Sequence, residues 1–308
     1  MKKCIIRGAV VFLCGIIVFS CAMLNMNWDY DKLSTLSEYH TVTKEYEGNK
    51  NIILKDRNVP VRIEKSADNK IHLTYSENED ETYSVSEQGN DISITKNVDF
   101  EWFERIFVVN FETPEFVIAL PEKYLGDLDI KTSNANIELI SVTANDCILK
   151  SSNGKIDLLD IFTETLSAVT SNSPIKALNV AVRKDAVLDT SNSQIVAESV
   201  TTQKLTVKTS NGDITAESVS ALDGVSLKTS NADIEVDEIY SNNIILKTSN
   251  SDIEGYIPGP ITDYTITSKT SNGDNNLPEN QVGGSKTLDV KTSNGDIEIV
   301  TYRANLSE

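Results

Sequence analysis

The sequence predicts an all-β protein, a single-stranded parallel β-solenoid (β-helix). A short phrase, clearest as Lys-Thr-Ser-Asn-Gly-Asp-Ile at residues 291–297, occurs nine times, and 19 to 22 residues separate its successive asparagines. A fixed period in this range is typical of coils that stack on their neighbours. Apolar and polar residues alternate on both sides of each asparagine, as in strands with one buried face. We expect right-handed coils, because crossovers between parallel strands almost always have that hand.

Two strands are expected in each repeat. Ile stands three residues after the asparagine in eight of the nine copies, and pairs such as Leu205 and Val207 stand six and four residues before it. A further apolar column eight residues after the asparagine, including Val219 and Ile239, predicts a third short leg or corner. Nine coils at the spacing of β-strands should give a stack about 40 Å long.

The Ser-Asn corner between the two strands is expected to turn the chain, since Asn tolerates compact turn conformations. Because the asparagine occurs in every copy while the following Gly does not, we expect a ladder of side-chain amides that bond from coil to coil; nine independent turns are the alternative. The predicted ladder consists of Asn134, Asn153, Asn172, Asn192, Asn211, Asn231, Asn250, Asn272 and Asn294.

Two charged columns flank the corner. A Lys stands three residues before the asparagine in seven copies, and an Asp two residues after it in five. We expect the two columns to neutralise each other, because stacked like charges repel. Calcium binding by the Asp column is the alternative, but the calcium-binding nonapeptide repeat has a different period, so we expect no metal.

Residues 1–27 read as a signal segment. Lys2, Lys3 and Arg7 precede an apolar run over residues 8–24, which indicates export with the start of the chain left in the cytoplasm. An uncleaved anchor, a lipoprotein and simple secretion are all open. In the second case Cys21 is the lipidation candidate, since residues 18–21 (Val-Phe-Ser-Cys) resemble a bacterial lipobox, although Phe19 fits that pattern poorly.

The rest of the chain divides by its pattern. We expect a linker over residues 28–47, a cap of irregular β-coils without the asparagine corner over 48–130, the repeat solenoid over 131–300 and a tail over 301–308. The apolar run at residues 106–111 reads as core, with an exposed contact patch as the alternative. Cys147 falls on an inward column and reads as a core residue.

The anchor, the Phe-Val-Ile-Ala-Leu-Pro run at residues 116–121 and the repeated Lys-Thr-Ser-Asn-Gly-Asp-Ile phrase together resemble the Toastrack family over roughly residues 48–300. That family comprises bacterial domains of unknown function that are often labelled adhesins. The resemblance implies a Gram-positive-type envelope protein, sometimes associated with envelope-stress systems, and it implies no catalytic residues.

A net charge of −18 argues against nucleic acid as a partner. We expect no cofactor and no enzyme activity, since no phosphate loop, metal-ligand spacing or nucleophile motif occurs. The sequence favours a membrane-tethered, non-catalytic envelope scaffold or adhesin-like binder. A sensory or regulatory module of an envelope-stress system is the alternative, and a glycan-active enzyme is the third possibility.

We expect a partner to dock on the irregular loops at 255–264 and 274–286, through Tyr256, Ile257 and Tyr264. The alternative is that these loops are merely tolerated insertions.

Overall fold

A computed structural model describes residues 12, 13, 15–21, 23, 24, 28, 39–98 and 114–302. The described elements are β1 (His40–Tyr46), β2 (Asn51–Lys55), β3 (Val61–Lys65), β4 (Ile71–Glu77), β5 (Glu81–Gln88), β6 (Asp91–Val98), β7 (Phe116–Leu120), β8 (Leu128–Lys131), β9 (Ile137–Ile140), β10 (Asp146–Lys150), β11 (Ile156–Thr163), β12 (Thr165–Val169), β13 (Ile175–Val182), β14 (Asp185–Asp189), β15 (Ile195–Lys208), β16 (Ile214–Lys228), β17 (Ile234–Ser241), β18 (Asn243–Lys247), β19 (Ile253–Tyr256), the 3-10 helix η3 (Ile261–Asp263), β20 (Tyr264–Lys269), β21 (Asn280–Gln281), β22 (Lys286–Lys291) and β23 (Ile297–Val300).

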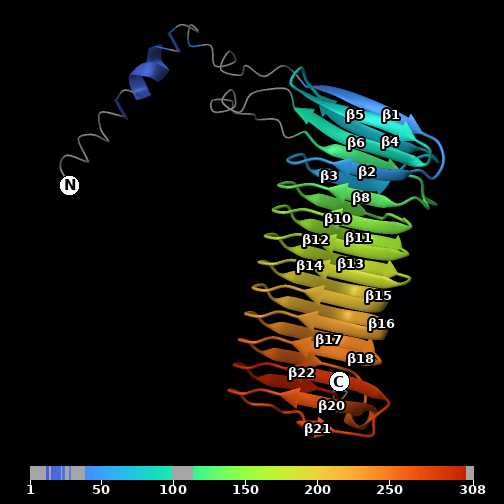
Figure 1. Ribbon diagram of the computed structural model, residues 1–308, viewed down its shortest axis with the longest axis vertical. Helices are drawn as coiled ribbons and strands as arrows, with labels where there is room; N and C mark the ends of the chain where they lie inside the picture. Colours follow the sequence, from blue (N-terminus) through green and yellow to red (C-terminus); the bar gives the residue numbers. More distant parts are fainter. Residues whose placement is uncertain are drawn as a thin grey trace, which may run out of the picture.

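The strands form a long stack of parallel coils (Figure 1). We call the strands that lead into the asparagine corners the first sheet and those that leave them the second sheet. In the first sheet β8, β10, β12 and β14 pair in parallel, and in the second sheet β9, β11 and β13 do the same. The long strands β15 and β16 leave one corner in the second sheet and enter the next corner in the first. The predicted parallel β-solenoid is therefore confirmed, while its hand stays a prediction.

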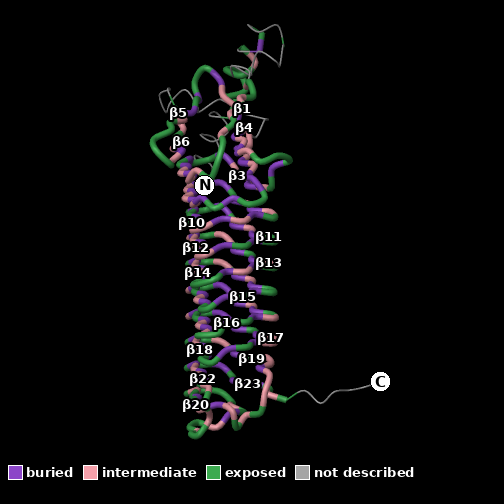
Figure 2. Tube along the Cα trace, turned by 90° about the vertical axis from the view of Figure 1, so that its right-hand side faces the viewer, coloured by how far each residue is buried: buried purple, intermediate pink, exposed green. Residues whose placement is uncertain are grey.

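The core lies between the two sheets along the whole stack (Figure 2). Alternating side chains of each strand point inward, and Ile214, Ile234 and Leu227 are fully buried. Cys147 of β10 is also fully buried, and burial raises the pKa of its thiol to about 12. A thiol that stays protonated in an apolar interior packs as a small core residue, as the sequence predicts.

A bend in the second sheet creates a third leg in each regular coil. The seventh residue after each of six asparagines is in the left-handed region with φ between 52° and 57°. The next residue, for example Val219 or Ile239, then points inward and is buried. The six bend residues are Ser141, Asp160, Asn179, Ser199, Ser218 and Glu238.

The coils at the N-terminal end are not stacked in chain order. Strand β2 lies between β6 and β8, and β3 lies between β7 and β9. Strand β1 pairs antiparallel with β4, so residues 40–46 form an edge strand and the expected linker is wrong there. The coil of β2 and β3 also turns at Asn58, whose amide oxygen accepts a hydrogen bond from Asn134 Nδ2 at 2.8 Å. The expected absence of an asparagine corner from the cap is therefore wrong.

The C-terminal end shows the same exchange of order. Strand β22 pairs with β18 on one side and β20 on the other, and β23 pairs with β19. The coil that turns at Asn294 thus lies inside the one that turns at Asn272. The chain first builds the outermost coil and then returns to fill the gap beneath it. This route accounts for the longer intervals between the last asparagines.

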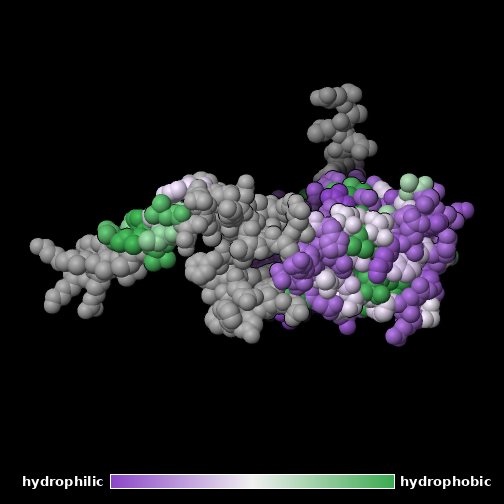
Figure 3. Space-filling model, turned by 90° about the horizontal axis from the view of Figure 1, so that it is seen from above, coloured by the Kyte–Doolittle hydropathy of each residue, from purple (hydrophilic) through white to green (hydrophobic). Residues whose placement is uncertain are grey.

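Two expectations concern parts outside the stack. Apolar side chains of residues 12, 13, 16–19 and 24 are exposed, and they show as an apolar cluster when the molecule is viewed from above (Figure 3). Among the described residues no helix combines the length and apolarity needed to cross a membrane. The apolar run at residues 106–111 lies outside the described residues.

Candidate functional site

The corner asparagines form one continuous line of side-chain hydrogen bonds. Each Nδ2 donates to the Oδ1 of the asparagine in the neighbouring coil at 2.7–2.8 Å, as Asn231 does to Asn211. In stack order the line begins at Asn58 and ends with Asn250, Asn294 and Asn272. These side chains are exposed, so the line runs along the surface of the corner and stabilises the stack from outside.

The charged columns beside the corner do not neutralise each other. In the described part of the chain, no ion pair joins a column Lys to a column Asp; Lys247 and Lys291 both bridge to Asp289 instead, at 2.6 and 2.9 Å. The column carboxylates accept backbone N–H groups of the next coil, as Asp233 does from Asp252 at 3.0 Å. The expected Lys–Asp pairing is therefore wrong, because four of the five column carboxylates, those of Asp213, Asp233, Asp252 and Asp296, accept a backbone N–H of a neighbouring coil instead.

A buried threonine column also holds the corners together. Thr229 Oγ1 donates to the carbonyl of Gly212 in the preceding coil at 3.1 Å, and Thr248 Oγ1 donates likewise to Ala232 at 3.0 Å. A buried carbonyl without a partner is costly, so these hydroxyls stabilise the corner. A Thr or Ser stands two residues before every one of the nine asparagines, and this column is the signal in the sequence from which the role could have been predicted.

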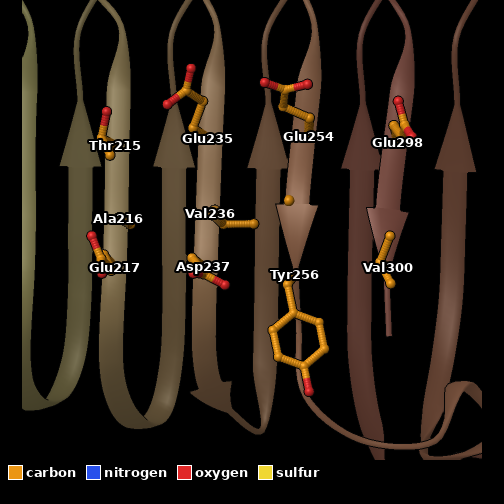
Figure 4. A pocket seen from close by; sticks show the side chains of 11 residues that line it. Thr215, Ala216, Glu217, Glu235, Val236, Asp237, Glu254, Tyr256, Glu298 and Val300 are labelled. Carbon is orange, nitrogen blue, oxygen red and sulfur yellow. The ribbon is translucent and has the colours of Figure 1, made fainter. Parts of the chain in front are cut away.

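A groove of about 530 Å³ lies on the outer surface of the second sheet, across β16, β17, β19 and β23 (Figure 4). We call it the acidic groove. Two rows of side chains from successive strands line it. Thr215, Glu235, Glu254 and Glu298 form one row, and Glu217, Asp237, Tyr256 and Val300 form the other.

The carboxylates of the acidic groove lie on adjacent strands in register. Glu235 pairs with Glu254, and Glu254 with Glu298, so like charges follow each other at the strand spacing of about 4.8 Å. No Lys or Arg is among the lining residues. Directly opposed like charges destabilise a sheet, and a cationic group placed in the groove would relieve that repulsion. The arrangement is therefore suited to binding positive charge.

The floor of the acidic groove requires a glycine. Gly255 has φ +136°, a conformation that side chains rarely adopt, and a Cβ there would stand 1.8 Å from the carbonyl oxygen of Val236. The polypeptide backbone forms the bottom of the groove at Gly255, with the carboxylates of the outward-pointing residues along its sides.

The predicted docking loops coincide only in part with this site. Tyr256 lines the acidic groove, whereas Ile257 is fully buried and Tyr264 is only 1% exposed. Tyr264 packs in the last coil, where its hydroxyl donates to the Pro258 carbonyl at 3.1 Å and Lys286 Nζ lies 5.4 Å from its ring. The prediction that Ile257 and Tyr264 are exposed contacts for a partner is therefore wrong, because both side chains are buried in the core at the C-terminal end of the stack.

Metal binding by the acidic residues is not indicated. Within the described ranges no group of three or more His, Cys, Asp or Glu side chains is placed to hold a metal ion. The carboxylates of the acidic groove form open rows on a flat sheet and do not converge on one point (Figure 4). Such rows fit an extended cationic ligand better than a single ion.

Several solved structures align with most of this chain at low sequence identity. A putative adhesin of Bacteroides fragilis is 15% identical, and the alignment covers 85% of this chain and 97% of that chain with a TM-score of 0.48. A putative adhesin of Parabacteroides merdae is 15% identical, with 84% and 96% coverage and a TM-score of 0.46. A putative lipid binding protein of Parabacteroides distasonis is 13% identical, with 85% and 97% coverage and a TM-score of 0.41. Among curated proteins no sequence relative matches.

The family comparison covers most of the chain. The model described as Toastrack DUF4097 matches residues 49–300, a range that extends from just before β2 to the end of β23. It thus includes the cap, every asparagine corner and the acidic groove, and it confirms the resemblance seen in the repeated phrase. The chain belongs to the Toastrack DUF4097 family.

Proposed function

We propose that the protein is an exported, membrane-tethered and non-catalytic binding scaffold of the cell envelope, adhesin-like in its mode of action. Its acidic groove takes up the cationic groups of a macromolecular partner. The observation that carries the proposal is the row of Glu235, Glu254 and Glu298, which lie in register on adjacent strands of an exposed sheet with no Lys or Arg among the lining residues of the groove. Regular stacked strands hold these groups in fixed rows, which favours recognition of an extended ligand with repeated positive charges.

Export and tethering are supported by the N-terminal sequence. Lys2, Lys3 and Arg7 precede the apolar run, as in signal segments, and the apolar side chains of residues 12, 13, 16–19 and 24 of that run are exposed. Whether the segment is cleaved before Cys21 or retained as an anchor, the acidic groove would project outside the membrane.

The binding arm of the test uses oligolysine as the cationic probe. The full chain is titrated calorimetrically, and we expect binding that weakens steeply as salt is raised. Replacing Glu217, Glu235 and Glu254 by Gln should weaken binding about tenfold or more. A matched variant with Glu47, Glu79 and Glu122 replaced by Gln, all exposed and outside the groove, should bind like the parent. Equal affinity of all three proteins would overturn the role of the groove.

The localisation arm uses a surface thiol introduced on the stack, and the parent chain, whose Cys21 is exposed, gives the background labelling. Asn242→Cys is placed on an exposed turn of the stack, and intact cells are treated with a maleimide that does not cross membranes. We expect labelling of intact cells and recovery of the labelled chain in the membrane fraction. Labelling that requires cell lysis would contradict export, and a labelled chain found only in the medium would contradict tethering.

A further inference from the structure

We infer that the partner of the acidic groove is a second copy of this chain, whose row of lysines on the first sheet docks on the groove. The inference rests on the proposed function, since it names the partner of the same site. It follows from the charge of the two outer faces of the solenoid and from their common spacing.

The first sheet carries an exposed lysine row on its outer surface. Lys208, Lys228, Lys247, Lys291 and Lys269 follow each other in register on five adjacent strands. Asp289 bridges two of them, Lys247 and Lys291. For the other three, Lys208, Lys228 and Lys269, the described residues provide no ion pair, and all three are exposed. The three lysines without an ion pair leave positive charge on this face, opposite in sign to the acidic groove.

The two faces cannot neutralise each other within one molecule. Lysines and carboxylates occur on the same corners, seven residues apart, as in Lys228 with Glu235, Lys247 with Glu254 and Lys291 with Glu298. Each of them alternates with buried residues and so faces outward, and the strands that carry the two rows lie on either side of the buried core. Figure 2 shows this burial pattern along the stack. Because these three corners each carry one charge of each sign on opposite faces, a neighbouring molecule can pair both rows at the same strand spacing.

The two rows are lost together at two corners of the stack. Where the lysine row is interrupted by Val169, the acidic position of the same corner holds Lys176. Where it is interrupted by Asp189, that position holds Val196. At two further corners only the acidic row is interrupted, since Thr215 follows Lys208 and Asn276 follows Lys269. The surface that a second copy can match therefore lies at the consecutive corners of Lys228, Lys247 and Lys291, where both charges are present.

The resulting contact joins unlike faces of two copies, so it leaves one lysine row and one acidic groove free. Such a heterologous contact does not close by itself and extends into a row of side-by-side solenoids. Copies tethered to one membrane in the same orientation already have their coils at matching heights. The tether would thus favour the contact by raising the local concentration of copies.

The test measures self-association of the full chain in detergent by sedimentation velocity. We expect oligomers at low salt that dissociate as salt is raised. One variant carries Lys208, Lys228 and Lys269 replaced by Glu, and the other carries Glu217, Glu235 and Glu254 replaced by Lys. Each alone should associate at least about tenfold more weakly, and an equimolar mixture should restore association, because one variant has two acidic faces and the other two basic faces.

Controls separate charge complementarity from unfolding and from the proposed function. Thermal melts must show both variants folded, and replacement of Lys65, Lys123 and Lys184 by Glu, all exposed and off the lysine row, should leave association unchanged. A parent chain that stays monomeric at low salt, or a mixture that is not restored, overturns the inference. If oligolysine still binds the parent in that case, the groove binds another partner and the proposed function stands. If oligolysine does not bind either, both fail.

Discussion

The interior of the stack and its two ends are built from the same coil but follow different rules. Between Asn134 and Asn250 each coil lies on the one that precedes it in the chain. At each end an outer coil is built out of order, with β2 and β3 enclosed at one end and β22 and β23 at the other. A solenoid has open strands at both ends, and such edges invite uncontrolled pairing. At each end the enclosed coil pairs with the outermost coil on one side and with the regular stack on the other, so it links the outermost strands to the rest of the molecule.

The largest expected effect comes from removing the enclosed coil at the C-terminal end. Truncation of residues 286–308 takes away the neighbour of β18 and of β20 at once. It also removes the buried Leu288, Val290, Ile297 and Ile299. Since each such side chain is worth about 2–5 kcal/mol, we expect a loss well above 5 kcal/mol and rapid hydrogen exchange in β18, β19 and β20.

A matched deletion gives this prediction its control. Asn250 and Asn294 are 44 residues apart, and deleting the 25 residues 259–283 leaves the regular interval of 19. That variant loses only the outermost coil, so β18 and β19 should keep their slow exchange against β22 and β23. If the truncated and the deleted chains showed the same exchange in β18 and β19, the enclosed order would be wrong.

The second prediction compares a glycine in the interior with one at the end. A Cβ on Gly212 would stand 1.9 Å from the Ser193 carbonyl oxygen, and one on Gly273 would stand 2.2 Å from that of Gly295. Gly212→Ala should cost up to about 3 kcal/mol, because coils on both sides prevent relaxation. Gly273→Ala should cost less, since its coil is outermost and can shift. Denaturant melts give both values; a larger loss for Gly273→Ala would contradict a rigid interior.

The structure of the interior could be predicted from the sequence because the repeat period reflects a packing requirement that every coil has to meet. Each coil must bury the same columns and turn at the same corner, so Ile214 and Ile234 serve as equivalent residues and their burial follows from alternation. The bend at residues such as Ser218 could not be predicted in the same way, because its left-handed φ is adopted there by Ser, Asp, Asn and Glu alike. Only the apolar residue that follows each of them indicated a corner.

The ends and the site were less predictable for a different reason. The corner at Asn58 lacks the Ser, Gly and Asp of the repeated phrase, and Asp56 takes the place of the buried Thr, with Tyr83 donating to its carboxylate at 2.6 Å. The acidic groove depends on which strands are adjacent: Glu254 and Glu298 are neighbours only because β23 is enclosed next to β19. A period cannot indicate an exchange of coil order, so these contacts had to come from the structure.

The third prediction tests the buried threonine column. Thr229→Val keeps the shape of the side chain but leaves the Gly212 carbonyl without its hydroxyl donor, and it should cost about 1–2 kcal/mol. Thr270 makes the same bond to Gly295 at 2.8 Å in the outermost coil but is only half-buried, so Thr270→Val should cost less. Melts of the two variants in denaturant give the comparison. Equal losses would mean that the hydroxyl is no more important in the interior than at the end.

The smallest expected effects concern the exposed corner. Asn231 both donates to Asn211 and accepts from Asn250, each at 2.8 Å, whereas Asn272 at the end of the line donates to Asn294. Asn231→Ala should therefore cost about 0.5–1.5 kcal/mol and Asn272→Ala about half as much, because water replaces part of each exposed bond.

Lys228→Ala should cost least, between about 0 and 1 kcal/mol, since its charge is solvated and it repels its lysine neighbours in the row. Denaturant melts at low and high salt separate the two kinds of residue, because salt should change the loss for Lys228→Ala and leave the loss for Asn231→Ala unchanged. A loss for Lys228→Ala that matched or exceeded that for Asn231→Ala would mean that charge, rather than the amide line, holds the corner together.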